Sequence, residues 1–324
     1  MVNLRRTWPA WSAGLASVAL VASVPGVSYA AFAGGDGRLV YADNGIVVAQ
    51  VLADHSTLVE TRLTTGHDVN PRWFSTGRRI VYNTTGGAIR TIAPDGSGGR
   101  VVVGDRDYQP APSPPLSSGT VRILFVHVPR GQGGDIWSVT STGTGLQRIT
   151  TDGAASCGNS WPTWSPSGRY VAWVHQARTS GGTCGVISVV LLDRQTNKRT
   201  VIVDRVDPAS GFDVAPAAGR LSFTSDDKSL VYPAEARSCV RLWGSYDIAT
   251  RSVSAYDFYE CEGDPEVWAV APEPSGGLAT TASYFNPDGP SPFCLRWSGG
   301  RACTLDDDQR PPFPFDGVDV QPVP

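Results

Sequence analysis

The sequence has little charge for its length, and neither sign dominates. Only 18% of the 324 residues are charged, and the formal net charge is −3 at pH 7. Proteins that bind nucleic acid or an acidic membrane usually carry a strong basic patch, because attraction to phosphate supplies much of their affinity. We therefore expect no nucleic-acid partner for this chain.

The sequence also lacks the short motifs that mark common catalytic and cofactor sites. It has no G-x-S-x-G, no H-E-x-x-H, no C-x-x-C and no loop of alternating aspartates, and it has only four histidines. A serine hydrolase, a zinc site and a calcium loop are therefore without support. The glycine-rich residues 131–134 join two predicted strands and open no helix, so we interpret them as a turn rather than a phosphate loop. No cofactor, metal or catalytic residue is predicted.

The one long, largely apolar run lies at the N-terminus. Arg5 and Arg6 precede the apolar residues 14–24, and Pro25 and a small-residue exit follow. This is the pattern of a secretory signal peptide. A transmembrane helix needs about 20 apolar residues, and Pro25 interrupts this run.

We therefore predict a signal peptide over residues 1–30 and one domain over residues 31–324. Cleavage after S-Y-A or after A-F-A, and export by the Sec or the twin-arginine route, both stay open. The mature chain is expected to have no transmembrane span. We place it outside the cytoplasm of a bacterium, either secreted or in the cell envelope.

Helical periodicity is scarce, whereas glycine and proline are plentiful, with 36 and 25 residues. This composition is typical of many short strands joined by turns. One pattern recurs: an aromatic residue, a small polar turn, usually a basic residue, an aliphatic residue and a closing aromatic. Clear copies occupy residues 32–41, 73–82, 164–173 and 223–232, and degraded copies begin at Pro112 and Pro272. Such self-similarity, at intervals of roughly forty to sixty residues, indicates a propeller or a solenoid.

Each copy is followed by two further predicted strands, which gives four strands per repeat in meander order. After residues 164–173, for example, they cover residues 186–193 and 199–203. A twisted four-stranded sheet that buries both faces against its neighbours is a propeller blade. We predict an all-β fold, a six-bladed β-propeller of four-stranded antiparallel blades.

The segments that enter the repeats also match one another. D-V-N-P begins at Asp68, D-Y-Q-P at Asp107 and D-V-A-P at Asp213. A further copy, D-V-Q-P, begins at Asp319, close to the C-terminus. We expect this last segment to complete the first blade and so to close the ring.

Residues 162–174, P-T-W-S-P-S-G-R-Y-V-A-W-V, resemble the repeat of TolB-type propellers, in which P-x-W-S-P-x-G precedes an apolar strand. The resemblance extends over residues 32–324. It implies the propeller fold and leaves the function open, because related blades occur in periplasmic translocation proteins, peptidase propellers and lyases. TolB carries an N-terminal domain and binds protein partners in the envelope. Here the propeller is expected to follow the signal directly, so the role of that domain is not implied.

His127 and His175 occupy the same place in neighbouring repeats, since I-L-F-V-H and V-A-W-V-H superpose. Asp43 is the equivalent residue of the first repeat. These residues could form a polar ring around a ligand mouth, or they could simply be partly exposed strand ends. Tyr259, in a long loop, and Trp268, outside the repeat pattern, are further candidates for a contact surface. A metal that bridges both histidines is disfavoured, because neighbouring blades splay apart.

The six cysteines all lie in the mature part, which agrees with an oxidising compartment. Cys157 and Cys184 lie in loops that should share one face of a blade, and Cys239 and Cys261 lie in the same two loop types further along. Cys294 and Cys303 flank a predicted two-residue turn symmetrically. We predict the disulfides 157–184, 239–261 and 294–303.

From these observations we expect a non-catalytic binding or scaffold protein, monomeric, that binds a protein, peptide or cell-envelope glycan through one loop face. Propeller core positions are used for packing, so specificity should come from the loops that the repeat does not dictate. Two alternatives stay open. One is a polysaccharide lyase or hydrolase acting at the propeller mouth, and the other is the stand-alone remnant of a peptidase-associated propeller.

Overall fold

The computed structural model describes residues 35–51, 58–203, 205–206, 213–236, 239–256, 266–272, 278–283, 293–297, 300–304 and 319–323. The predicted signal peptide lies outside these ranges. The described chain consists of β-strands joined by turns, so the all-β prediction is confirmed. No helix within these ranges is long and apolar enough to cross a membrane.

Five sheets have four strands in meander order, and each is one blade of a propeller. The first blade contains β26 (Asp319–Val323), β1 (Gly35–Ala42), β2 (Ile46–Val51) and β3 (Leu58–Arg62). The second contains β4 (Asp68–Trp73), β5 (Ile80–Thr84), β6 (Ile89–Ile92) and β7 (Arg100–Val103). The third contains β8 (Asp107–Pro112), β9 (Arg122–His127), β10 (Asp135–Thr140) and β11 (Gln147–Arg148).

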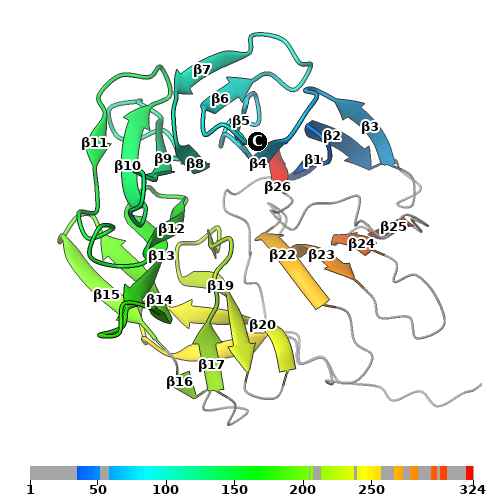
Figure 1. Cartoon of the computed structure of the whole chain (residues 1–324). Coiled ribbons are helices and arrows are strands. Elements are labelled where there is room, and N and C mark those ends of the chain that lie inside the picture. Colours follow the sequence, from blue (N-terminus) through cyan, green and yellow to red (C-terminus); the bar gives the residue numbers. More distant parts are fainter. Residues whose placement is uncertain are drawn as a thin grey trace, which may run out of the picture.

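The fourth blade contains β12 (Gly158–Trp164), β13 (Tyr170–Arg178), β14 (Cys184–Asp193) and β15 (Lys198–Ile202). The last blade contains β22 (Glu266–Pro272), β23 (Leu278–Ser283), β24 (Phe293–Trp297) and β25 (Gly300–Thr304). Between these two lies a sheet of six strands, which we call the irregular sheet. Its strands are β16 (Arg205–Val206), β17 (Asp213–Pro216), β18 (Ser222–Phe223), β19 (Ser229–Ala236), β20 (Cys239–Asp247) and β21 (Val253–Tyr256). Figure 1 shows the sheets arranged in chain order around a central axis.

The prediction of six four-stranded blades is therefore wrong, because the structure has five. In the irregular sheet the innermost strand is broken into β17 and β18, and β16 is added outside β17. Pro216 ends β17, and Pro233 stands in the facing strand β19. Because proline has no N–H, it interrupts the ladder of hydrogen bonds between two strands. Prolines at the position of Pro216 leave β4, β8 and β12 unbroken, so the feature particular to this sheet is Pro233, beside which the chain between Pro216 and Ser222 leaves the strand path.

The ring closes as predicted, because β26 pairs with β1 in antiparallel orientation. Its register differs from the alignment of the repeats. Asp319 faces Val40, whereas Asp68, its equivalent in the alignment, faces Thr84 at the end of β5. Val40 and Val81 are equivalent in the repeat alignment, and Arg72 faces Val81. Asp319 is therefore at the same level as Arg72, and this shift brings the carboxylate of Asp319 to the propeller axis.

The core consists of apolar layers between neighbouring sheets. The aromatic residues at repeat positions, which we expected to be core, are at most 5% exposed: Trp73, Tyr82, Trp164 and Trp173. Trp73 and Tyr82 pack against first-blade residues such as Ile46, and Trp164 and Trp173 pack with third-blade residues such as Leu124. Each such aromatic removes a large apolar area from water, which stabilises the radial packing of the sheets.

Candidate functional site

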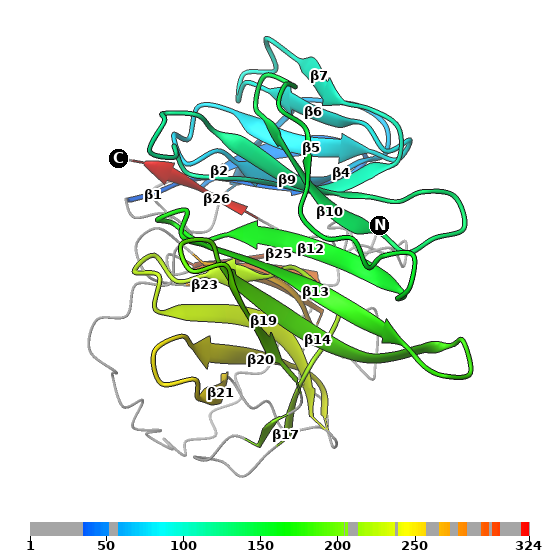
Figure 2. The same cartoon turned by 90° about the vertical axis from the view of Figure 1, so that its left-hand side faces the viewer.

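In the first four blades, the turns that follow the second strand lie on one side of the propeller, which we call the loop face. It is formed by the turns after β1, β5, β9 and β13 and by the connections that enter the second, third and fourth blades. The hairpin of β13 and β14, with strands of nine and ten residues, extends beyond its neighbours here (Figure 2). Because the strands follow one another in meander order, these turns and connections must lie on the same face.

A pocket of about 300 Å³ opens on the loop face where the third and fourth blades meet. Its polar lining consists of Tyr108, Gln109, Gln132, Asn159, Ser160 and Gln176, and its apolar lining includes Val126, Val128, Val174 and Ile187. In the described part of the chain, none of the lining residues is charged. The pocket therefore offers amide, hydroxyl and aromatic groups together with aliphatic side chains.

The inner strands next to this pocket carry a repeated backbone distortion. Asn70, Gln109 and Trp161, each just before a proline, have positive φ angles of 55°, 53° and 51°. At each of them the register of the strand pair shifts, as in a β-bulge. Such a backbone conformation is uncommon for residues other than glycine and costs on the order of 1–3 kcal/mol, so neighbouring contacts must hold it in place.

Hydrogen bonds within and between blades supply these contacts. The main-chain N–H of Gln109 donates to Asn83 Oδ1 over 3.1 Å, and Asn70 Nδ2 donates to the same oxygen over 2.9 Å. The main-chain N–H of Trp161 donates to Gln109 Oε1 over 2.7 Å. Consecutive bulges are therefore tied together around the axis, and the pocket side chain Gln109 is held by the fourth blade.

Asn159 organises the seam between the third and fourth blades. Trp173 Nε1 lies 3.0 Å from Asn159 Oδ1, and because an indole N–H can only donate, this atom is the carbonyl oxygen. His175 Nδ1 lies 3.0 Å from the same oxygen, so Nδ1 carries a proton and the lone pair of the neutral ring is on Nε2. Asn159 Nδ2 donates to Asp152 Oδ1 over 2.8 Å and to Thr150 Oγ1 over 3.2 Å. The buried amide therefore has partners for both of its ends.

His127 has the equivalent place in the third blade, and its partner is a carboxylate. Asp107 faces His127 in the register of β8 and β9, and Asp107 Oδ1 lies 2.8 Å from His127 Nδ1. Burial raises the pKa of Asp107 to about 6, although the hydrogen bond with His127 acts in the opposite direction. The imidazole contacts Trp137 edge-on, with ring centroids 5.9 Å apart, and 37% of its side chain is exposed. An imidazole oriented in this way by a carboxylate has the geometry of a general base or a metal ligand.

Sequence analysis did not predict the pair of Asp107 and His127. The repeat alignment contained the signal, since Asp107 starts an inner strand and His127 ends the strand beside it. Two such positions face each other in an antiparallel pair. In the second blade the same positions hold Asp68 and Thr84, and in the fourth blade Asn159 and His175.

Among the other candidate ligand residues, Asp43 is not part of the lining of the pocket. Asp43 lies on the loop face but forms an ion pair with Arg62 of its own blade, over 2.8 Å from Oδ2 to Nη2. Trp268 lies in β22, and Tyr259 lies outside the described residues. Neither His127 nor His175 lines the pocket, although Asn159 connects His175 to it. Within the described ranges, no three His, Cys, Asp or Glu side chains gather as metal ligands.

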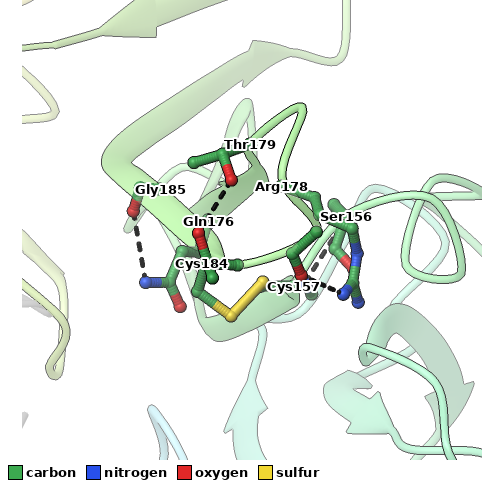
Figure 3. Close-up of a disulfide and its surroundings, with 10 residues drawn as sticks. Ser156, Cys157, Gln176, Arg178, Thr179, Cys184 and Gly185 are labelled. Carbon is green, nitrogen blue, oxygen red and sulfur yellow. Dashed lines mark hydrogen bonds between the residues drawn. A yellow bond between two sulfur atoms is a disulfide. The ribbon is translucent and has the colours of Figure 1, made fainter.

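The predicted disulfide between Cys157 and Cys184 is confirmed. Figure 3 shows it at the loop face, where Arg178 Nη2 also donates to the main-chain oxygen of Ser156 over 3.1 Å. Cys157 lines the pocket, so the disulfide ties one wall of the pocket to the β13–β14 hairpin.

The two other predicted disulfides are not settled. Cys294 and Cys303 face each other in the register of β24 and β25, as expected for a pair. Cys239 is the first residue of β20, and Cys261 lies outside the described residues.

Four glycines allow the seam to close beside the pocket. A Cβ atom at Gly133 would lie 2.5 Å from the oxygen of Gly153, and one at Gly158 would lie 2.7 Å from the nitrogen of Gly134. Side chains at these positions would separate the two blades, because real Cβ atoms do not approach so closely. The glycine-rich segment is thus explained by close backbone packing, in line with the turn predicted there.

Comparisons with known proteins support the fold. No protein-family model and no curated protein matches the sequence. Among solved structures, TolB from Acinetobacter baumannii is similar with a TM-score of 0.59 and 14% identity, over 89% of this chain and 67% of that one. A putative TolB from Agrobacterium tumefaciens gives 0.53 and 12%, over 84% and 89%. Hydrazine synthase from Kuenenia stuttgartiensis gives 0.58 and 11%, over 85% and 45%. At such low identity these likenesses show the fold alone, and that fold is the β-propeller.

Proposed function

We propose that this chain is an exported, monomeric, non-catalytic propeller that binds a protein, peptide or cell-envelope glycan through its loop face. The observation that carries the proposal is the uncharged pocket between the third and fourth blades. The disulfide of Cys157 and Cys184 beside it is consistent with an oxidising compartment, because such bonds persist mainly outside the cytoplasm.

The lining indicates what kind of group would bind. Gln109, Gln132 and Gln176 each offer both a donor and an acceptor, and Tyr108 offers an aromatic ring and a hydroxyl group. Sugar hydroxyls and peptide main-chain amides need this mixture of donors and acceptors. A strongly charged group would have no counter-charge in this lining and would lose its hydration. The ligand part that enters the pocket is therefore neutral and polar.

The pocket is also held in shape before any ligand arrives. Gln109 accepts a hydrogen bond from the fourth blade, Asn159 has hydrogen-bond partners at both ends of its amide, and Cys157 is covalently fixed. Rigid walls lower the entropy that binding must overcome. This favours a binding site over a surface that merely connects strands.

The test is calorimetric titration of the mature protein with neutral cell-wall oligosaccharides and with unstructured peptides. We expect one of the two classes to bind, and Tyr108→Ala or Gln132→Ala to weaken binding at least tenfold, or about 1.4 kcal/mol. The matched control is Ser167→Arg, an exposed turn on the opposite face, which should bind as the unchanged protein does. Binding that is lost only in the control variant would contradict the proposal.

A lyase or hydrolase is the second candidate, because Asp107 and His127 form a carboxylate–imidazole pair on the same face. Mass spectrometry of the incubated oligosaccharides separates the two functions. Cleavage that disappears in the double variant His127→Ala with His175→Ala would favour the enzyme. Intact oligosaccharides, together with saturable binding, favour the binding protein.

A further inference from the structure

Another pocket, of about 180 Å³, lies between the fourth blade and the irregular sheet, on the face opposite the loop face. Figure 1 shows these two sheets next to each other around the axis. The fourth blade contributes the start of β13, the end of β14 and the start of β15, and the irregular sheet contributes the end of β20 and the turn after it. This opposite-face pocket has no lining residue in common with the loop-face pocket.

The inner wall of the opposite-face pocket is the end of an apolar core. The buried cluster between the two sheets includes Leu191, which is 4% exposed, and Tyr246, which is 1% exposed. Tyr170 and Ile248 pack against this cluster and are only partly buried. The ring of Tyr170 also stacks on that of Phe223, with centroids 6.3 Å apart. A ligand with an apolar part would cover the exposed portions of this wall and remove them from water.

The polar side of the pocket follows from the register of the fourth blade. Tyr170 faces Asp193, and Asp193 faces Lys198, across β13, β14 and β15. Residues opposite each other in antiparallel strands project from the same face of a sheet, as do residues two positions apart. Thr200, which faces Leu191, therefore shares this face. The blade thus places a carboxylate, an ammonium group and a hydroxyl group beside the apolar wall.

The carboxylate of Asp193 is engaged by the protein itself. Its Oδ2 accepts a hydrogen bond from Arg169 Nη2 over 2.7 Å, and its Oδ1 accepts from the main-chain N–H of Gln195 over 2.9 Å. The bond from Arg169 is the main reason why the pKa of Asp193 falls to about 2. Asp193 is therefore ionised, and its charge is balanced within its own blade.

Lys198 is the cation that this balance leaves over. It is exposed, and its ammonium group forms no ion pair within the described part of the chain. Arg169 also has donors to spare, because Asp193 is the one acceptor described for its guanidinium and its buried Nε has none. The nearby Asp247 accepts from two main-chain N–H groups of its own turn. Positive charge beside an apolar wall attracts an anion more strongly than it would in open water, because the wall lowers the local dielectric.

We propose that the opposite-face pocket binds a carboxylate carried on a small apolar body, either a free aliphatic acid or the last residue of a peptide. The carboxylate lies between Lys198 and the guanidinium of Arg169, and the apolar body covers Tyr170 and Ile248. The volume of about 180 Å³ is below the range of roughly 300–1,000 Å³ that drug-sized ligands occupy, so it suits one side-chain-sized group. This site goes beyond the loop-face function and does not depend on it.

The experiment is an NMR titration of the mature protein with labelled leucine and isoleucine methyl groups. The probes are 4-methylpentanoate as the free acid, N-acetyl-leucine as the peptide end, N-acetyl-leucinamide as the same body without charge, and acetate as the charge without the body. We expect saturable shifts of the Leu191 and Ile248 methyl signals with at least one of the two larger acids, with a dissociation constant in the millimolar range. Ile187, which lines the loop-face pocket, should not shift.

The relative affinities decide between the sources and against the proposal. Tighter binding of 4-methylpentanoate assigns a free acid, and tighter binding of N-acetyl-leucine assigns a peptide end. No saturable shift with either acid would overturn the proposal. It would also be overturned if the amide or acetate bound as tightly as the better acid.

Two variants locate the site. Lys198→Gln removes the charge of an exposed side chain and should weaken binding of the acids about fivefold. Thr200→Phe fills the pocket from the edge strand β15 and should abolish the shifts. Arg78→Gln, an exposed cation on the same side of the propeller in the second blade, is the matched control and should bind as the unchanged protein does. Undiminished binding in both Lys198→Gln and Thr200→Phe would show that the carboxylate binds elsewhere.

Discussion

The loop-face seam and the axial cluster are both polar contacts between blades, but they are balanced in different ways. At the seam, Asn159 has partners for its amide and its carbonyl, and one of these partners, Asp152, is an exposed carboxylate. At the axis, Arg220 forms an ion pair with the carboxylate of Asp319, and the charges of both residues act on Arg72. A neutral network can satisfy every group at low cost, whereas a buried charge needs a counter-charge. The seam is therefore suited to a fixed pocket, and the axis to ring closure.

Removal of the closing strand should have the largest effect on stability, because it removes Asp319 and its ion pair at the axis. Deletion of residues 318–324 exposes the edge of β1 and leaves Arg72 and Arg220 without the carboxylate of Asp319. The loss of one partner of a buried ion pair alone costs about 3–5 kcal/mol. We expect a much lower Tm and aggregation through the exposed edge, measured by circular dichroism and gel filtration.

Asp319→Asn is the control for that deletion, since it keeps the strand and removes only the charge. Its stability should lie between that of the deletion and that of the unchanged protein. Thermal unfolding that does not change on deletion would mean that β26 contributes nothing to closure.

Loss of the disulfide at the loop face should have an intermediate effect. Cys157 and Cys184 close a loop of 27 residues, for which chain entropy predicts about 3.5 kcal/mol of stabilisation. In the double variant Cys157→Ser with Cys184→Ser, urea unfolding should show this loss, and ligand affinity at the pocket should fall with it. Cys294→Ser with Cys303→Ser is the comparison, with a smaller loss expected for its shorter loop. If the variant of Cys294 and Cys303 lost as much stability as the variant of Cys157 and Cys184, or more, this ranking would be wrong.

The smallest effect concerns pH at the loop face. The pKa of Asp107 is raised to about 6 by burial, so in the folded state it keeps its proton over a range where the unfolded chain has already lost it. Its contribution to stability is therefore complete below the unfolded pKa, near 4, and is lost as the pH rises through about 6. Between pH 4 and pH 7 this amounts to about 1–2 kcal/mol.

Asp107→Asn removes the titration and keeps an oxygen that can accept from His127. Urea unfolding at several pH values should therefore show a flatter pH dependence for this variant than for the unchanged protein. If the two proteins differ by a constant amount at every pH, Asp107 does not titrate in this range.

Local pattern in the sequence was enough to predict the meander of four strands, the closure by the segment at Asp319 and the equivalence of His127 and His175. These depend on side-chain alternation and turn residues, which neighbouring positions in the chain determine. The disulfide of Cys157 and Cys184 followed in the same way, because both loops end on one face of the same blade. The repeat also contained the pairing of Asp107 with His127, although it was not predicted.

The tertiary structure alone decided the features that depend on contacts between blades. Two of these features are the break around Pro216 and the shifted register of β26. Together they bring Arg72, Arg220 and Asp319 close to one another, although Arg72 and Asp319 are 247 positions apart in the sequence. The bulge at Gln109 is likewise held by Trp161 of the next blade. A repeat pattern describes each blade by itself, and it carries no information about which side chains meet when blades pack around an axis. That packing determines both the uncharged pocket and the charged axis.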